Sequence, residues 1–187
     1  VLNNSCSSSF TNCVIESNSF LVGGSSFGVF GAGMVINGGS CSILNSVFSN
    51  NTGGSGFLDS SRGGALVIDG TANIVNSVFY NNSAQNGAAL LFGGGDANLS
   101  TVTNCSFVNN TGSFVGVGYQ GFSKAIFKNC LFWNNTPTSN PVVGRDEIYS
   151  QENRIGFQPT FINCIIRDAT GNPLAITNTV LVNSSNS

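Results

Sequence analysis

A six-residue pattern of apolar and polar positions recurs along the chain. It reads apolar, any residue, Asn, Cys or Ser, any residue, then Phe or Ile. Six copies align without gaps at residues 10–15, 43–48, 74–79, 102–107, 127–132 and 161–166, and a degraded seventh lies at 181–184. Their Asn residues are 33, 31, 28, 25, 34 and 20 positions apart. Repetition at about 30 residues with variable spacing predicts a solenoid whose coils carry loops of different length.

A second pattern, Gly followed by small residues and an apolar run, recurs between these copies. It occurs at residues 31–38, 63–70 and 87–94, with weaker versions at 116–121, 147–150 and 173–176. Each period therefore holds three short extended runs, and their β-branched and aromatic residues favour strands over helices. The sequence predicts an all-β fold, a right-handed parallel β-helix of about six coils with three short strands each.

The Asn shared by the six-residue copies predicts a corner of the coil. Residues an even number apart share a face of a strand, but the apolar position before Asn and the Phe after it are five apart. Both face the core only if the chain turns between them, and Asn readily adopts the left-handed conformation of a corner. We therefore expect an internal ladder of stacked amides formed by Asn12, Asn45, Asn76, Asn104, Asn129, Asn163 and Asn183. The alternative is that these Asn are ordinary surface turn residues.

The same phase predicts three columns of inward side chains. The first contains Ile43, Ile74, Val102, Phe127 and Phe161. The second contains Phe48, Phe79, Phe107 and Phe132, and the third contains Met34, Leu66 and Leu90. Because strands of neighbouring coils lie about 4.8 Å apart, these columns predict a continuous core along a rod.

Composition indicates how the chain keeps a polar surface with few ions. Only 7% of its residues are charged and the net charge is -2, whereas it contains 27 Asn and 26 Ser. Like charges repeated on every coil would repel along the rod, so neutral groups take their place. Without a basic surface we expect no nucleic-acid binding. No apolar run approaches the roughly 20 residues of a spanning helix, so we expect no membrane insertion.

Two tetrapeptides carry a family resemblance. Phe-x-x-Asn occurs at residues 48–51, 79–82, 107–110 and 132–135, and alternates with Gly-Gly-Ala-Leu at 63–66 and its variants at 31–34 and 87–90. This alternation resembles the repeats of chlamydial polymorphic outer membrane proteins and of related right-handed parallel β-helix surface proteins. The resemblance covers residues 10–183, nearly the whole chain. It implies a segment exposed at the cell surface and involved in adhesion, without identifying the organism.

Both ends of the chain fall inside the repeat. Residues 1–5 align with residues 107–111, and residues 183–184 open a further copy. We expect one β-helix domain over residues 1–187, a fragment of a longer array with further coils of the same parent chain beside it. The alternative is self-association of open-ended copies into a filament, because uncapped coil ends template pairing.

Four of the six cysteines share one repeat position, directly after the corner Asn, where other copies have Ser. They are Cys13, Cys105, Cys130 and Cys164. The spacing between coils lies within the Cα range of a disulfide. These residues are therefore candidates for disulfides between coils or for a column of free thiols in the core. Cys6 and Cys41 form a second candidate pair, and spacings of 25 to 34 residues without His do not fit a zinc site.

Asn-x-Ser/Thr triplets mark candidate glycosylation sites. Five share the position just after the Phe strand and predict an exposed column on one edge: Asn3, Asn50, Asn81, Asn109 and Asn134. The triplets at Asn104 and Asn183 belong to the predicted internal ladder, so we expect them to be unmodified.

The acidic residues do not predict a catalytic centre. Polysaccharide cleavage on a β-helix needs paired carboxylates, or a basic residue beside a calcium-binding acidic cluster. One local charged group lies within residues 145–154, and Asp69 and Asp96 are weak candidates for a shared metal ion. Ordinary surface charge explains both better. We expect no catalytic residues, no metal and no cofactor.

These observations predict a non-catalytic extracellular or cell-surface structural protein, a rigid stalk or adhesin-type segment, with filament assembly as an option. The alternative is a polysaccharide-binding or polysaccharide-cleaving β-helix. Tyr80 and Trp133 both follow a Phe of the core column, which predicts outward rings three coils apart. These rings make host or surface glycans a minor hypothesis for the partner.

Overall fold

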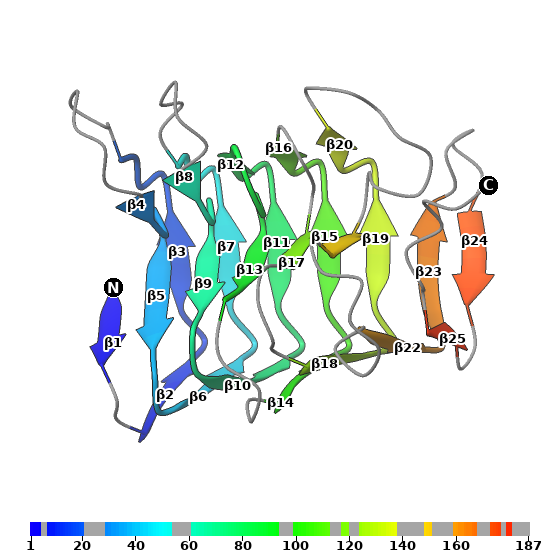
Figure 1. The fold of residues 1–187 in the computed structure, drawn as a ribbon, viewed down its shortest axis with the longest axis horizontal. Coiled ribbons are helices and arrows are strands. Elements are labelled where there is room, and N and C mark those ends of the chain that lie inside the picture. Colours follow the sequence, from blue (N-terminus) through cyan, green and yellow to red (C-terminus); the bar gives the residue numbers. More distant parts are fainter. Residues whose placement is uncertain are drawn as a thin grey trace.

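The chain forms a parallel β-helix in a computed structural model, with its strands stacked along one axis (Figure 1). The structure describes residues 1–4, 7–20, 29–53, 61–93, 99–112, 117–119, 124–137, 148–150, 159–167, 173–176 and 179–180. Within these ranges there is no helix, and hence none that could cross a membrane.

Three parallel sheets run along the rod. Sheet A contains β1 (Leu2–Asn4), β5 (Met34–Asn37), β9 (Leu66–Ile68), β13 (Leu90–Phe92), β17 (Val117–Tyr119) and β21 (Ile148–Ser150). Sheet B contains β2 (Ser7–Thr11), β6 (Ser40–Leu44), β10 (Thr71–Val75), β14 (Leu99–Thr103), β18 (Lys124–Lys128) and β22 (Thr160–Ile162). Sheet C contains β3 (Val14–Glu16), β7 (Val47–Ser49), β11 (Val78–Tyr80), β15 (Ser106–Val108), β19 (Leu131–Trp133) and β23 (Cys164–Arg167).

Each coil contributes one strand to each sheet, which confirms the predicted six coils of three short strands. The chain winds right-handed from β1 to β23 (Figure 1), as crossovers between parallel strands nearly always do. Smaller sheets join some of the coils: β12 (Ser83–Ala84), β16 (Thr111–Gly112) and β20 (Thr136–Pro137) form one, and β4 (Val29–Phe30) with β8 (Ser61–Arg62) the other. The sequence patterns did not predict these extra strands.

The last two strands run against the others. β24 (Pro173–Ile176) pairs antiparallel with β23, and β25 (Thr179–Val180) pairs antiparallel with β22. The prediction that residues 173–176 continue the Gly-Ala-Leu strands of sheet A was therefore wrong. These strands cover the edges of sheets B and C beside the sixth coil. The degraded copy at 181–184 lies outside the described residues.

The first strand also corrects an alignment. Residues 1–5 were expected to match residues 107–111, but Leu2 to Asn4 pair with Val35 to Asn37 in sheet A. β1 is thus a neighbour of the Gly-Ala-Leu strand, not of the strand that carries Phe. The expected match depended on the pair Asn3-Asn4, which resembles Asn109-Asn110 in sequence but lies in a strand of sheet A.

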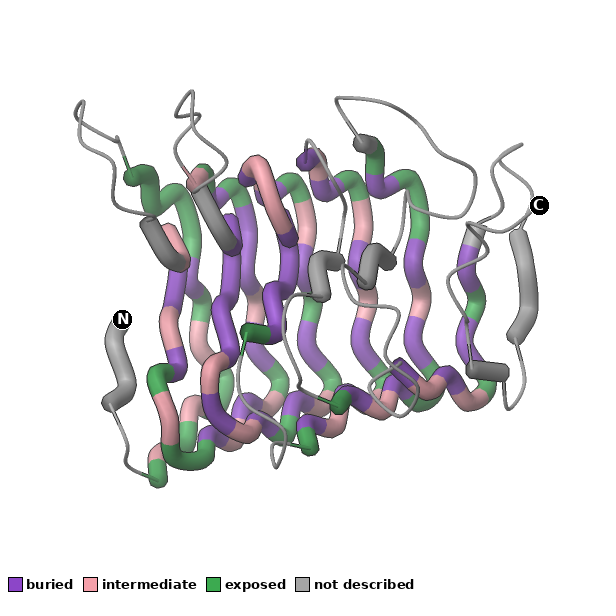
Figure 2. The backbone as a smooth tube through the Cα atoms, viewed as in Figure 1, coloured by how far each residue is buried: buried purple, intermediate pink, exposed green. Residues whose placement is uncertain are grey.

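The predicted core columns are confirmed residue by residue. Strand pairing puts Ile43, Ile74, Val102, Phe127 and Phe161 in register, and it does the same for the other two columns. Every predicted member has 0% exposure. Figure 2 shows buried positions alternating with intermediate or exposed ones along the strands of sheet B. A one-residue slip of any strand would turn its apolar side chains to solvent, which fixes this register.

The Phe column fits the spacing of the coils. Successive rings from Phe48 to Phe132 have centroids 4.8, 5.0 and 4.8 Å apart and are nearly parallel. Phe127 and Phe161 stack in the same way in the neighbouring column, at 5.1 Å. Rings of the two columns meet edge to face, as with Phe107 and Phe127 at 6.1 Å. Both geometries are favourable for aromatic pairs, so the column gains stacking as well as burial.

The two glycines of the Gly-Gly-Ala-Leu motif at residues 63–66 are each required for a different structural reason. Gly63 has a φ of 70°, in the left-handed region that favours glycine. A Cβ on Gly64 would lie 2.5 Å from the Ala88 carbonyl oxygen and 2.6 Å from that of Ser83. The first glycine therefore makes the turn into β9, and the second lets the backbone of the next coil approach.

Candidate functional site

The predicted Asn ladder exists, but it lies on the outside of the coil. We call its described members the outer Asn ladder: Asn12, Asn45, Asn76, Asn104, Asn129 and Asn163. All have φ between 49° and 55° and all are exposed. The predicted corner is thus confirmed and the predicted internal position is wrong. Asn183 lies outside the described residues.

Amides of the outer Asn ladder bond from one coil to the next at the surface. The Nδ2 group of Asn76 donates to Asn45 Oδ1 at 3.3 Å, Asn104 to Asn76 at 3.2 Å, and Asn129 to Asn104 at 3.1 Å. Water competes for these exposed groups, so each bond contributes little to stability. The main contribution of this ladder is the left-handed backbone conformation at the corner.

The position after this corner explains why Ser and Cys alternate there. Ser77 Oγ donates to the Val75 carbonyl at 3.0 Å and accepts the Ser46 N–H of the preceding coil at 3.1 Å. Cys105 Sγ makes the same two contacts, donating to the Thr103 carbonyl at 3.3 Å and accepting the Ser77 N–H at 3.4 Å. Either side chain satisfies both backbone groups, so the thiol is a structural equivalent of the hydroxyl.

The described cysteines are free thiols. Cys105, Cys130 and Cys164 follow one another on three successive coils and are almost fully buried, whereas Ser46 and Ser77 separate Cys13 from them. Cys41 is buried in sheet B, and Cys6, its candidate partner, lies outside the described residues. The structure thus has the thiol alternative, and a disulfide on adjacent coils stays a prediction.

Hydrogen bonds along this run shift the thiol pKa values. The bond with Cys130 lowers the pKa of Cys105 from its ordinary value of 9.0. The same bond raises the pKa of Cys130 to about 12. The bond with Cys130, followed by burial, raises the pKa of Cys164 as well. Cys105 is therefore the member of the run that ionises first.

A second corner follows sheet C and carries the predicted glycosylation column. Asn50, Asn81, Asn109 and Asn134 have φ between 53° and 55° and are exposed, as predicted. Asn3 does not belong to this column, because it pairs with Ile36 in sheet A. Asn104 was expected to be shielded within an internal ladder, but it is exposed. Modification itself stays a prediction, which mass spectrometry of the native protein at these four sites would test.

The residue after each of these corners forms the ladder that is truly internal. We call it the inner Asn ladder: Asn18, Asn51, Asn82, Asn110 and Asn135. Its last four members have 0% exposure. From the sequence, the Phe-x-x-Asn motif indicated only a resemblance to surface-protein repeats, and the burial of its Asn was not predicted. The signal was present, since an Asn recurs three residues after the inward Ile or Phe in five copies.

Each interior amide of this ladder uses its full bonding capacity. Asn110 Oδ1 accepts the N–H of Asn82 at 3.0 Å and its Nδ2 group at 2.9 Å. Asn110 Nδ2 donates to the Phe79 carbonyl at 3.0 Å and to Asn135 Oδ1 at 2.8 Å. The same contacts recur at Asn51 and Asn82. Buried amides without such partners would be costly, so the ladder replaces hydrophobic packing at this corner.

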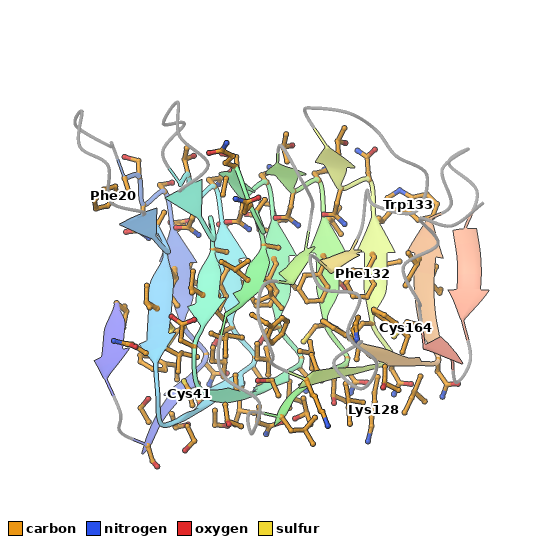
Figure 3. All side chains as sticks on the ribbon, in the orientation of Figure 1. Phe20, Cys41, Lys128, Phe132, Trp133 and Cys164 are labelled. Carbon is orange, nitrogen blue, oxygen red and sulfur yellow. The ribbon has the colours of Figure 1, made fainter. Side chains whose placement is uncertain are left out.

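The outer faces of sheets B and C differ in chemistry. Outward positions of sheet C fall into two columns in register: Val14, Val47, Val78, Ser106, Leu131 and Ile165, and then Glu16, Ser49, Tyr80, Val108 and Trp133. Ser49 is the exception to their exposure, because it is fully buried between Glu16 and Tyr80 in its column. Several apolar members are well exposed, with Val14 at 62%, Ile165 at 45% and Trp133 at 38%. Most outward residues of the first four strands of sheet B are Ser, Thr or Asn. Its fifth strand carries the exposed Lys124 and Lys128, of which Lys128 is labelled in Figure 3.

Tyr80 and Trp133 are closer than predicted. They lie in one column with Val108 between them, two coils apart and not three. Successive residues of β19 point opposite ways, since Phe132 is buried in the core and Trp133 is exposed (Figure 3). A sequence interval of variable length does not reveal this spacing, because the loops between coils change length.

The described carboxylates do not converge. Glu16 ends β3 in sheet C, whereas Asp69 follows β9 in sheet A. Within the described ranges no group of three or more His, Cys, Asp or Glu residues could hold a metal ion. Asp96, the other weak metal candidate, and the charged group at 145–154 lie outside the described residues, apart from the backbone of Ile148–Ser150.

No family model, no curated protein and no solved structure matches this chain. The resemblance to surface-protein repeats therefore rests on the two tetrapeptides alone.

Proposed function

We propose that this chain is a rigid, non-catalytic stalk or spacer segment of an extracellular surface protein. The observation that carries the proposal is the continuity of the ladders. The Phe column and the inner Asn ladder repeat the same contacts on successive coils. A solenoid of this kind resists bending because each coil is bonded to its neighbours along three sheets. The repeat resemblance supports the location at a cell surface.

Strand pairing favours a stalk over a head-to-tail filament. Addition of a parallel coil from a second copy needs open edges on sheets B and C. β25 and β24 already pair with β22 and β23 at those edges. A filament would have to displace both strands, and so would a further parallel coil of the parent chain at this end, whereas a single stalk that finishes at these strands requires neither.

The non-catalytic part of the proposal rests on charge and has its own test. Glu16 and Asp69 are the carboxylates among the described residues, and they lie on different sheets. Depolymerisation of a polysaccharide by the purified chain, abolished by Asp146→Asn or Glu147→Gln, would overturn it.

Electron microscopy of the native source tests the stalk itself. We expect isolated rods as part of a larger surface protein, together with labelling of intact cells by an antibody against the chain. Ordered fibres whose subunit repeat equals the rod length would favour the filament instead. Labelling only after cell lysis would contradict the extracellular location.

A further inference from the structure

The outer face of sheet C has the properties of a binding surface for an extended ligand. We call its apolar residues the sheet C strip: Val14, Val47, Val78, Tyr80, Val108, Leu131, Trp133 and Ile165. Solvated sheet faces normally alternate apolar inward and polar outward residues. Sheet B follows this rule over most of its length and sheet C does not, although both faces belong to the same coils.

The size of the strip argues against a protein partner. Six coils at about 4.8 Å give a length of about 24 Å, and two columns of side chains give a width of roughly 10 Å. The flat footprint of the strip is then about 250 Å², only part of the roughly 800 Å² of accessible surface that each partner of a stable protein interface buries. A narrow ligand that lies along the rod axis fits these dimensions.

The charges on the outer face of sheet C favour an uncharged ligand. None of the described side chains in the two outward columns of sheet C is cationic. Glu16 lies at one end, and at the other end β23 finishes with Arg167, whose side chain is outside the described ones. Both borders of the face are rows of exposed neutral amides, the outer Asn ladder on one side and Asn50, Asn81, Asn109 and Asn134 on the other. Nucleic acids and acidic polysaccharides need Lys or Arg at the contact, so this face does not complement them.

The aromatic residues and the amides occur as matched pairs. Tyr80 is followed by the exposed Asn81, and Trp133 by the exposed Asn134. One coil separates the two pairs, which places them about 10 Å apart. A sugar ring has an apolar C–H face that stacks on an aromatic ring, and hydroxyl groups at its rim that bond to amides. The spacing of the pairs is close to the length of a disaccharide unit in an extended chain.

We propose that the outer face of sheet C binds a linear, neutral polysaccharide that lies along the solenoid axis, with sugar rings stacked on Tyr80 and Trp133. The exposed amides that border the strip take the hydroxyl groups. This inference goes beyond the stalk and does not depend on it, since the same surface exists on a rod in any location. It excludes glycosylation of Asn81 and Asn134 in the binding form, because an attached glycan would cover the rings.

Trp133 is the only tryptophan of the chain, so its fluorescence reports directly on the proposed site. The test uses the 187-residue chain made in a bacterial host that does not modify Asn. The probes are hexamers of β-1,4-linked glucose and of β-1,4-linked N-acetylglucosamine, the matching disaccharides, and a galacturonate hexamer as the acidic comparator. We expect a saturable change in Trp133 emission with at least one neutral hexamer, and about tenfold weaker binding of its disaccharide, which cannot reach both rings.

Variants assign the binding to the rings. Tyr80→Ala should weaken hexamer binding about tenfold by fluorescence, and Trp133→Ala at least as much by calorimetry, whereas Trp133→Phe retains most of it. Ile126→Ala, on the outer face of sheet B, is the matched control and should bind like the parent. Since Tyr80 and Trp133 project outward, circular dichroism should show that both Ala variants keep the fold.

Four outcomes would overturn the proposal. They are the absence of saturable binding to either neutral hexamer, unchanged affinity in both Ala variants, tightest binding of the galacturonate hexamer, and a dimer in light scattering that Trp133→Ala dissociates. The last would make the strip an interface between copies. None of these results bears on whether the native protein is a stalk, which microscopy decides separately.

Discussion

The two Asn ladders use one residue type for opposite purposes. Both stack amides from coil to coil, and Asn81 and Asn82 are even neighbours in sequence, one exposed and the other at 0% exposure. In the outer Asn ladder the amides face water, and the Asn residues stabilise the fold mainly through their left-handed backbone conformation. In the inner Asn ladder the amides fill the core and stabilise the fold through their hydrogen bonds. The energetic value of an Asn ladder therefore depends on its solvent exposure.

Asn110→Ala should have the largest effect. It removes the acceptor of two Asn82 donors and leaves the Phe79 carbonyl and Asn135 Oδ1 each short of a donor, all in the core. Buried groups without partners cost about 1–3 kcal/mol each, so we expect a loss of at least about 4 kcal/mol in the free energy of unfolding. Urea unfolding followed by circular dichroism measures it. A loss similar to that of Asn104→Ala would show that burial does not separate the ladders.

Coupling between neighbouring amides should also separate the ladders. Asn82→Ala and Asn110→Ala remove overlapping bonds, so the double variant should be more stable than the sum of the single losses by about 1–2 kcal/mol. The pair Asn76→Ala and Asn104→Ala shares one exposed bond, at 3.2 Å, and should be additive within roughly 0.5 kcal/mol. Two such cycles, measured by urea unfolding, give the comparison. Equal coupling energies would contradict it.

Asn104→Ala should cost about 1 kcal/mol, because Ala is disfavoured in the left-handed conformation that Asn104 adopts at a φ of 53°. Asn104→Gly is the matched variant. It loses the same amide but accepts that conformation freely, so its stability should lie within roughly 0.5 kcal/mol of the parent. If Gly were as destabilising as Ala in thermal unfolding, the exposed amide bonds would matter more than the backbone.

Cys130→Ser should have the smallest effect at neutral pH, below about 1 kcal/mol, because Ser46 and Ser77 already serve at the same position. Alkaline pH should reveal a difference. The hydrogen bond with Cys105 raises the pKa of Cys130 from 9.0 to about 12. Native Cys130 thus keeps a proton that the unfolded chain releases, and its stabilising contribution, full below pH 9, is lost as pH rises toward 12.

Unfolding measured across this pH range should therefore show a shallower decline for Cys130→Ser than for the parent. Cys13→Ser is the control, since Ser46 and Ser77 separate Cys13 from the run of three thiols. A parallel decline in the parent and the Cys130 variant would mean that the thiol run does not govern alkaline stability.

Much of the fold could be predicted because a solenoid repeats its local code. The spacing between the apolar residue, Asn and Phe at 74–79 requires a corner, and the structure has one there with Asn76 at a φ of 50°. The inward columns follow from the same parity. Residues 173–176 were assigned wrongly, because apolar composition fits an antiparallel strand such as β24 as well as a parallel one.

The candidate sites were harder to predict, since they depend on which coils become neighbours. Loops of different length separate the repeats, so 53 residues between Tyr80 and Trp133 span two coils, whereas 34 residues between Asn129 and Asn163 span one. A sheet face with consistent chemistry, such as the sheet C strip, becomes visible only when the coils are stacked.

The sequence alone determined the coil: its period, its three strands, its inward columns and the Asn at its first corner. These follow from local parity and backbone preference, which six or seven residues carry. Only the tertiary structure decided which Asn row is buried. Asn81 and Asn82 have the same side chain, and a single left-handed residue between the strand and the next turn sends one amide to water and the other into the core. The sequence shows that both Asn recur in each copy of Phe-x-x-Asn, but solvent exposure after a corner is a property of the closed coil.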